Sequence, residues 1–287
     1  MLRYAPFFSA LKEIIDSGEI GDIVSVVHNE NVGNIHQSHS FVRGNWSNSK
    51  ESAPMILAKS CHDMDILQWL IGKKCLKINS FGSRKFFNRA NCPEGAPARC
   101  TDGCKHDCPY DARKVYAEDA WYGKGWFRPV VANCANPTDE EVTAALKTGP
   151  YGRCVFRCDN DVVDHQTVNM EFEDGVTVMF SMCGLTPDTS RTIKIMGTKG
   201  QIMGHMEKKD ILVTNFLTRE ERKAEVKLAI EGGHGGGDAG IINAFSEYVS
   251  GAYTGNAISE ITVSAENHML AFAAEESRTD GGRTIEL

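Results

Sequence analysis

His62 is the residue best placed for acid/base chemistry. It lies near the start of a predicted helix, directly after the loop-like stretch Ser52–Ser60, so its imidazole can face a cleft. Histidine titrates near neutral pH, and an enzyme that takes a hydride from an alcohol needs a base for the hydroxyl proton. The nearby Lys59 could supply a positive charge or a hydrogen-bond donor. On the residues alone, the plainer interpretation is that His62 caps the helix or bonds a backbone carbonyl.

Three further polar residues are candidates for binding a substrate. His165 lies in Asp161-Val-Val-Asp-His-Gln166, on a predicted strand whose alternate polar positions could line a cleft or face solvent. His234 lies in Gly232-Gly-His-Gly-Gly-Gly-Asp238, and its glycine neighbours let the backbone approach a ligand closely. Asp238 adds an acceptor for the hydroxyl groups of a sugar or polyol. A flexible turn before a helix, with Asp238 as its N-cap, explains the same residues.

Four of the five cysteines in residues 88–136 lie close together, in a segment with no convincing helical or strand period. We expect this segment to be an insertion held together by something other than a core. Four thiolates suit tetrahedral Zn²⁺, which would stabilise the insertion directly, and His106 is a reserve ligand. An iron–sulfur cluster and free thiols stay open, because the spacing C-x7-C-x3-C-x3-C matches neither ferredoxin pattern. The four cysteines are Cys92, Cys100, Cys104 and Cys108.

The composition is that of an ordinary globular protein. Of the 287 residues, 41% are hydrophobic and 24% are charged, which excludes a disordered chain. The 31 basic and 38 acidic residues give a net charge of −7, which argues against nucleic acid or an anionic membrane as a partner. No apolar run approaches the roughly 18 residues of a membrane span, and residues 1–15 lack the apolar centre of a secretory signal. With 10 cysteines, these features predict a cytoplasmic protein.

Hydrophobic periodicity predicts the elements that must position these residues. Residues 7–15 and 61–70 have helical spacing of apolar side chains, and Thr138-Asp-Glu-Glu141 is a capping box for a helix that ends at Gly149. The dipeptide Asp174-Gly175 favours a hairpin. Further helices are predicted at 239–250 and 261–277, and strands at 22–31, 77–87, 162–173, 176–183, 192–196, 201–205, 211–216, 224–230 and 284–287.

Successive hairpins indicate a largely antiparallel sheet. We therefore expect one α+β domain over residues 1–287, with an open sheet, helices packed on one of its faces, and the cysteine-rich insertion at about 88–136. The polar stretch 33–54 is predicted to be a long loop, which in a compact domain is usually functional.

Five short motifs resemble the Gfo/Idh/MocA oxidoreductases, in the order expected for that family. They are Leu2-Arg-Tyr-Ala-Pro-Phe-Phe8, Asp16-Ser-Gly-Glu-Ile-Gly21, His62-Asp-Met-Asp65, Gly197-Thr-Lys-Gly200 and Ala273-Ala-Glu-Glu-Ser-Arg278. The resemblance implies NAD(P)-dependent oxidation or reduction of a sugar, polyol or related hydroxyl compound, with His62 as acid/base and Lys59 as its neighbour. It also implies a homo-oligomer formed through the open face of the sheet.

The chain departs from that family in two respects. Family members begin with a Rossmann domain of roughly 120 residues, which carries a glycine-rich βα turn. Here Met1 lies where that domain would end, and the glycine-rich residues 232–238 have the wrong spacing and follow an antiparallel sheet. The family also has an aspartate four residues before the helix histidine, where this chain has Ala58. We therefore expect the chain to be the substrate-binding and catalytic half of such an enzyme, inactive without a nucleotide-binding domain.

Two other functions stay open. The chain could be a non-catalytic carbohydrate-binding or oligomerisation module, in which His62→Ala would change only affinity. It could also be the catalytic half of a redox-assisted, NAD-dependent glycosidase or lyase, an idea to which Ala58 gives some weight. Net cleavage without net NADH formation would separate such an enzyme from a dehydrogenase.

Overall fold

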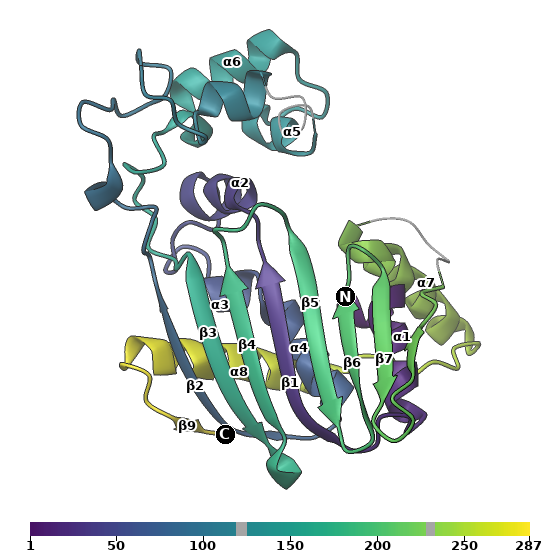
Figure 1. Cartoon of the computed structure of the whole chain (residues 1–287). Coiled ribbons are helices and arrows are strands. Elements are labelled where there is room, and N and C mark those ends of the chain that lie inside the picture. Colours follow the sequence, from purple (N-terminus) through teal and green to yellow (C-terminus); the bar gives the residue numbers. More distant parts are fainter. Residues whose placement is uncertain (119–124, 228–232) are drawn as a thin grey trace.

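Strands from both ends of the chain form one sheet (Figure 1). The computed structural model describes residues 1–118, 125–227 and 233–287. Within these ranges nine strands are hydrogen-bonded, and of the neighbouring pairs only the fifth and sixth in the sheet run parallel. In spatial order the strands are β8 (Glu221–Lys223), β7 (Asp210–Asn215), β6 (Gly200–His205), β5 (Ser190–Gly197), β1 (Ile23–Asn31), β4 (Thr177–Cys183), β3 (His165–Phe172), β2 (Cys75–Ser83) and β9 (Ile285–Glu286).

A tight turn joins β3 to β4, as the sequence predicts. Asp174 and Gly175 have φ angles of 57° and 74°, in the left-handed region that the favoured hairpin turns require. In the resulting register Val168 lies opposite Phe180, and both are buried. Side chains alternate along a strand, so the residues between these positions point to the opposite face.

Helices cover one face of the sheet and leave the other open. In Figure 1, α3 (Met55–Ala58), α4 (Cys61–Ile71) and α8 (Ile261–Thr279) lie behind the central strands, while α1 (Pro6–Asp16) and α7 (Gly237–Ser250) lie near β6 and β7. The predicted α+β fold, with an open and largely antiparallel sheet, is therefore confirmed. In the described part of the chain, no helix has the length and apolar content needed to cross a membrane.

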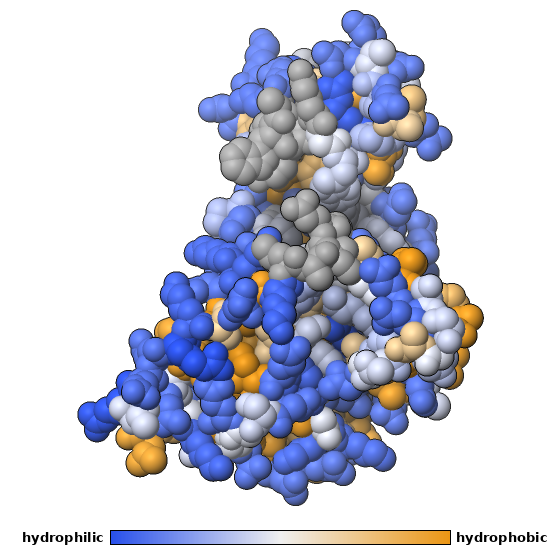
Figure 2. Space-filling model, turned by 90° about the vertical axis from the view of Figure 1, so that its right-hand side faces the viewer, coloured by the Kyte–Doolittle hydropathy of each residue, from blue (hydrophilic) through white to orange (hydrophobic). Residues whose placement is uncertain are grey.

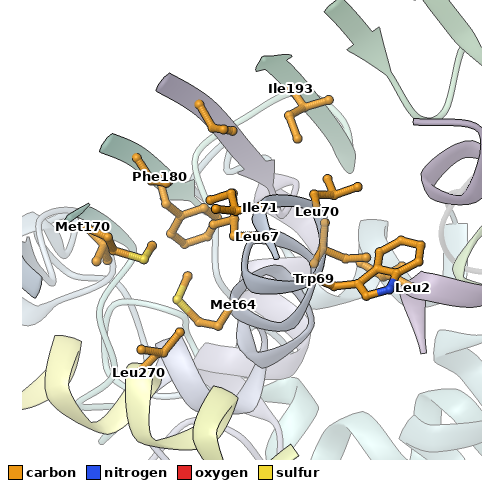
Figure 3. Close-up of a cluster of buried hydrophobic side chains, with 14 of the residues drawn as sticks. Leu2, Met64, Leu67, Trp69, Leu70, Ile71, Met170, Phe180, Ile193 and Leu270 are labelled. Atoms are coloured by element: carbon orange, nitrogen blue, oxygen red, sulfur yellow. The ribbon is translucent and has the colours of Figure 1, made fainter. Parts of the chain in front are cut away.

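Large apolar side chains fill the space between α4 and the sheet (Figure 3). Met64 and Leu67 of α4 belong to the same buried cluster as Phe180 of β4, Ile193 of β5 and Leu270 of α8. The spacing of apolar residues along α4 gives the helix one inward face, as the sequence predicts. This packing fixes the N-terminal end of α4 relative to the strands.

The cysteine-rich segment belongs to a smaller lobe above the ends of the strands (Figure 1). The lobe contains α5 (Phe127–Ala132), α6 (Asp139–Thr148) and the turns η3 (Arg89–Asn91), η4 (Lys114–Glu118) and η5 (Pro150–Gly152). The expectation that it lacks a core was wrong, because its irregularly spaced apolar residues meet in a second buried cluster. That cluster includes Ile35, Val42, Phe87, Cys100, Tyr110, Tyr116, Phe127, Val142, Leu146 and Phe156.

The predicted capping box opens α6. The backbone N–H of Glu141 donates to Thr138 Oγ1 at 3.2 Å, and the backbone N–H of Thr138 donates to Glu141 Oε2 at 2.8 Å. These two bonds satisfy donors that have no partner inside the helix. The helix ends at Thr148, directly before the predicted Gly149.

Residues 33–54 are not the long loop that their composition predicts. They contain α2 (Asn34–His36) and η2 (Gln37–Arg43), and all seven residues of η2 are buried. Ser38 Oγ donates to Ile35 O at 2.8 Å, so at least part of this buried polarity is satisfied by backbone. The polar composition of residues 33–54 therefore did not indicate that η2 is buried.

Two predicted strands differ in extent from the observed ones. β2 ends at Ser83 rather than Phe87, because the backbone N–H groups of Lys85 and Phe86 turn to donate to the Asp164 carboxylate at 3.0 and 2.7 Å. The strand predicted at 224–230 is not formed at 224–227, and residues 228–230 lie outside the described ranges. The short β8 occupies the preceding residues instead.

Candidate active site

His62 lies half-buried at the N-terminal end of α4, beside the glycine-rich turn. Its ring centroid lies 5.3 Å from that of His234, with the two rings at 76°. His234 Nδ1 in turn lies 2.7 Å from Asp238 Oδ1. The structure thus brings together three residues that the sequence singled out from distant parts of the chain.

The turn η7 (Gly233–Gly236) presents His234 toward His62. His234, Gly235 and Gly236 have φ angles of 53°, 65° and 95°, a left-handed run that glycine adopts without strain. Asp238 was expected to cap α7, but the N-cap is Gly236 and makes no side-chain capping bond. The carboxylate of Asp238 is hydrogen-bonded to His234 instead. Gly232 of the predicted motif lies outside the described residues.

The surroundings of His62 keep its imidazole neutral. Burial lowers the pKa of His62 to about 4, and the nearby Arg191 charge, the His234 ring and the amine of Met1 act in the same direction. The adjacent Asp63 carboxylate raises the pKa of His62, but by less than the other effects lower it. A neutral imidazole at pH 7 has a free lone pair, so His62 can accept a proton from a hydroxyl group.

Lys59 lies in the break between α3 and α4, with 15% of its side chain exposed. Its Nζ is 3.1 Å from Oε1 of Glu30, which is fully buried on the helix-covered face of β1. The other oxygen of Glu30, Oε2, is 2.6 Å from Arg191 Nη2. Lys59 is therefore the outermost member of a buried ion-pair network.

The network continues under His62. Arg191 Nε donates to Asp63 Oδ1 at 2.9 Å, and the same oxygen lies 2.7 Å from His28 Nε2. Sequence reasoning did not identify Glu30 and Arg191 as members of such a network. The detectable signal was the occurrence of polar residues at inward positions of a strand. Val26, His28 and Glu30 occupy every second position of β1 and all lie on its covered face.

The buried carboxylates of Asp63 and Glu30 both pair with the Arg191 guanidinium, but their pKa values shift in opposite directions. Burial would raise the pKa of Asp63, but Arg191 and the hydrogen bond from His28 hold that pKa well below its usual range. Burial and the Asp63 charge raise the pKa of Glu30 to about 7, against the attraction of Arg191 and Lys59. Glu30 is thus the carboxylate of this pair that takes up a proton first.

The smaller lobe contributes an aromatic wall on the Lys59 side. Trp126, 58% exposed, lies 5.3 Å from the ring of His36 and nearly perpendicular to it. Burial lowers the pKa of His36 to about 4, and the charge of Lys59 lowers it further. His36 therefore connects Trp126 of the lobe with Lys59.

His165 lies elsewhere. It begins β3, and its inward neighbour Gln166 is buried while His165 points to the open face. Its Nδ1 lies 2.9 Å from Asp164 Oδ1. His62 sits on a helix of the covered face, so the two histidines occupy opposite sides of the sheet. A substrate contact of His165 stays a prediction.

The cysteines of the lobe are free thiols. Cys100, Cys104 and Cys108 line one small hollow together with Cys154, whereas Cys92 lines a different one. In the described ranges, no three or more His, Cys, Asp or Glu side chains are arranged to hold a metal ion. Cys100 packs in the hydrophobic cluster of the lobe. The zinc or iron–sulfur site predicted at these positions, with His106 in reserve, has no support here.

Comparison with known proteins agrees with this fold. Residues 12–92 match the family described as "Oxidoreductase family, C-terminal alpha/beta domain" of the Gfo/Idh/MocA group. Over 256 residues the chain is 24% identical to "Putative oxidoreductase YteT" of Bacillus subtilis (strain 168), and this match covers 82% of the chain.

Solved structures share the fold at low sequence identity. An oxidoreductase domain protein from Kribbella flavida superposes with a TM-score of 0.66 at 11% identity. The match covers 99% of this chain and 64% of the Kribbella flavida chain. A levoglucosan dehydrogenase in complex with NADH and levoglucosan superposes with a TM-score of 0.60 at 15% identity, with the same coverage. The chain spans 56% of the length of the curated relative.

Proposed function

We propose that this chain, of which residues 12–92 match the C-terminal domain of the Gfo/Idh/MocA oxidoreductases, is the substrate-binding and catalytic part of an NAD(P)-dependent enzyme acting on a sugar, polyol or related hydroxyl compound. The observation that carries the proposal is the neutral His62 beside His234 and Asp238, with the cationic Lys59 three residues earlier in the chain. These residues supply a proton acceptor and several hydrogen-bonding groups for a polyhydroxyl compound.

The chemical roles follow from the charge states. A nicotinamide, when bound, would take the hydride from the substrate carbon. His62 accepts the hydroxyl proton, so that the two electrons leave with the hydride and the product is a carbonyl. The Lys59 ammonium donates a hydrogen bond to the substrate oxygen, which gains negative charge as its proton departs. In the reverse direction, the protonated His62 returns the proton.

The glycine-rich turn does not suit the pyrophosphate of a dinucleotide. A helix N-terminus binds phosphate when its N–H groups and positive dipole end face the anion. At the start of α7 the carboxylate of Asp238 occupies the first turn and faces His234. Its negative charge would repel a pyrophosphate. We therefore assign the nucleotide to a separate nucleotide-binding domain.

An uncovered apolar surface on α7 supports that assignment. Ile242, Phe245 and Val249 are 67%, 67% and 70% exposed, and their spacing places them along one side of the helix. Figure 2 views this side of the molecule and shows hydrophobic residues at the surface among predominantly hydrophilic ones. α7 starts at Gly237, directly after the turn that carries His234, so a domain that delivers nicotinamide to His62 would lie against it. Large exposed apolar patches commonly mark such contacts.

The open face of the sheet supports a homo-oligomer. Phe81, Met179 and Met203 lie on the strands with 56%, 47% and 49% of their surfaces exposed. A second copy that covers this face would bury them, and symmetric pairing of one patch is the commonest form of oligomer. Light scattering would test this assembly, and Met179→Lys should favour the monomer.

The test of function measures ligand binding and turnover separately. Calorimetric titration of the chain with polyols, starting with myo-inositol and levoglucosan, should detect a ligand whose affinity falls at least tenfold in Lys59→Met. With a nucleotide-binding domain fused or added, that ligand should drive NADH formation, and His62→Gln should abolish it. His268→Gln is the matched control, because His268 is exposed on α8 and bonds only its own helix at Ser264 O.

The outcomes distinguish the alternatives. Ligand binding without NADH formation in any arrangement would favour a carbohydrate-binding module. Net cleavage of a glycoside without net NADH formation would favour the redox-assisted glycosidase or lyase. NADH binding by the chain alone would overturn the assignment of the nucleotide to a separate domain.

A further inference from the structure

Glu30 has an environment that the proposed reaction does not explain. Its carboxylate is fully buried, yet it pairs with Lys59, the partly exposed cation of the network. Each of its two oxygens has one charged neighbour, Lys59 at 3.1 Å and Arg191 at 2.6 Å. A buried carboxylate is stable as an anion only when its charge is compensated.

The charges around Glu30 balance only while Lys59 stays in place. Arg191 also serves Asp63 at 2.9 Å, so two carboxylates share one guanidinium. Lys59 supplies the second positive charge. If the Lys59 ammonium turned away to bind an oxygen of a ligand, Glu30 would keep Arg191 as its charged neighbour, and Arg191 is shared with Asp63, which also contacts His28. The surplus negative charge would then have to be removed by a proton.

We propose that Glu30 is a positioning residue of the candidate site, which holds Lys59 by an ion pair and releases it by taking up a proton. The proton comes from solvent and converts the carboxylate to a carboxylic acid, while Lys59 stays an ammonium and becomes free to donate to a ligand. The assignment of Lys59 to substrate binding rests on the proposed function, but the exchange between Glu30 and Lys59 does not.

The titration of Glu30 depends on every charged group packed around it. Burial and Asp63 raise its pKa to about 7, so the exchange falls within the physiological range. His28 and His62 contact or adjoin Asp63 rather than Glu30. The groups concerned are His28 on β1, His36 on α2, Lys59, His62 and Asp63 at the start of α4, Arg191 on β5 and Glu207 after β6.

The experiment follows the Glu30 carboxyl by ¹³C NMR from pH 4 to 9, in the absence of cofactor and substrate. We expect one carboxyl signal with a midpoint near 7, assigned by its loss in Glu30→Gln. In Lys59→Met the midpoint should rise by about one pH unit or more, because one of the two compensating charges is gone. Lys59→Arg should restore it. Lys77→Met, which removes an exposed cation 3.9 Å from Glu171, should leave it unchanged.

A crystal structure of Glu30→Gln tests the release itself. The uncharged amide mimics the protonated acid, so Lys59 Nζ should lie outside hydrogen-bond distance of position 30 and nearer to His36. A Glu30 midpoint at the ordinary 4.5, or the same midpoint in Lys59→Met, would overturn the proposal. Neither measurement needs turnover. A negative result here would therefore not contradict the proposed reaction, and an absence of turnover would not contradict the exchange between Glu30 and Lys59.

Discussion

The sheet and the smaller lobe reach a buried core by different means. In the sheet, regular alternation along the strands places Val26, Ile195 and Phe180 on one face, where α4 and α8 cover them. In the lobe, short helices and turns enclose a core of aromatic rings and thiols around the buried Arg43. A regular period of apolar residues is therefore one route to a buried core. Irregular segments can also be buried, provided that each backbone N–H and C=O group finds its own hydrogen-bond partner.

The largest expected effect comes from a substitution that creates a cavity in the core beneath the sheet. Phe180→Ala removes a fully buried ring between β4 and α4, and should lower the free energy of unfolding by about 4 kcal/mol. Hydrogen exchange measured by mass spectrometry should then show weaker protection throughout the nine strands. Phe216→Ala is the control, because that ring is half exposed. Equal losses in the two variants would contradict this account of the sheet core.

The next prediction breaks the lobe alone. Arg43 Nε donates to Arg153 O at 2.8 Å and Nη2 donates to Tyr110 O at 2.6 Å, inside the lobe. Arg43→Met leaves both carbonyls without these donors, which should cost the lobe about 3 kcal/mol. Exchange should quicken in residues 84–160 while β3 and β4 keep their protection.

A matched variant checks that the Arg43 effect comes from burial. Lys114 also lies in the lobe, but its side chain is 50% exposed and that of its partner Asp107 is 95% exposed. Lys114→Met should therefore cost much less than Arg43→Met. Loss of protection spread evenly over sheet and lobe would show that the two cores unfold as one unit.

Acid should weaken the lobe through His39. Burial lowers the pKa of His39 to about 3, from 6.5. A depressed pKa contributes stability that is complete above pH 6.5 and is lost as pH falls toward 3. At pH 5 the loss should reach about 2 kcal/mol. Denaturant unfolding at pH 7 and pH 5 measures it. His39→Phe should reduce the loss by about that amount, while the part due to His36 and His62, whose pKa values are also lowered, remains. An unchanged slope would exclude a contribution from His39.

The smallest effect concerns the one lobe element that the sequence predicts in detail. Thr138→Ala removes the acceptor for the Glu141 backbone N–H, which should cost about 1 kcal/mol. Thr138→Ser should keep most of the stability. If both variants melt alike in thermal unfolding followed by circular dichroism, the capping bond does not stabilise α6.

The sequence was sufficient wherever a local rule determined the structure. The apolar spacing of α4, the turn at Asp174 and Gly175, and the capping box of α6 are all set by neighbouring residues. The core of the lobe was not predictable, because residues such as Ile35, Phe87 and Leu146 meet across long separations without any shared period.

The candidate site was predictable only in part for the same reason. His62 and His234 could be named because helix position and glycine neighbours mark them. Glu30 and Arg191 lie on different strands, and only the pairing of β1 with β5 brings them within 2.6 Å. A single charged residue in a strand gives no sign of its partner, so a buried network of this kind emerges only with the topology.

The position of β1 has a consequence for how the chain is made. β1 is formed by residues 23–31, but its two neighbours are formed by residues 177–183 and 190–197. During synthesis, the central strand of the sheet must therefore wait, with its apolar side chains unpaired, until most of the polypeptide has left the ribosome. Long-range strand pairing of this kind is slow and exposes intermediates to aggregation. The segment that contains β1 is accordingly where we expect a chaperone to engage these residues during synthesis.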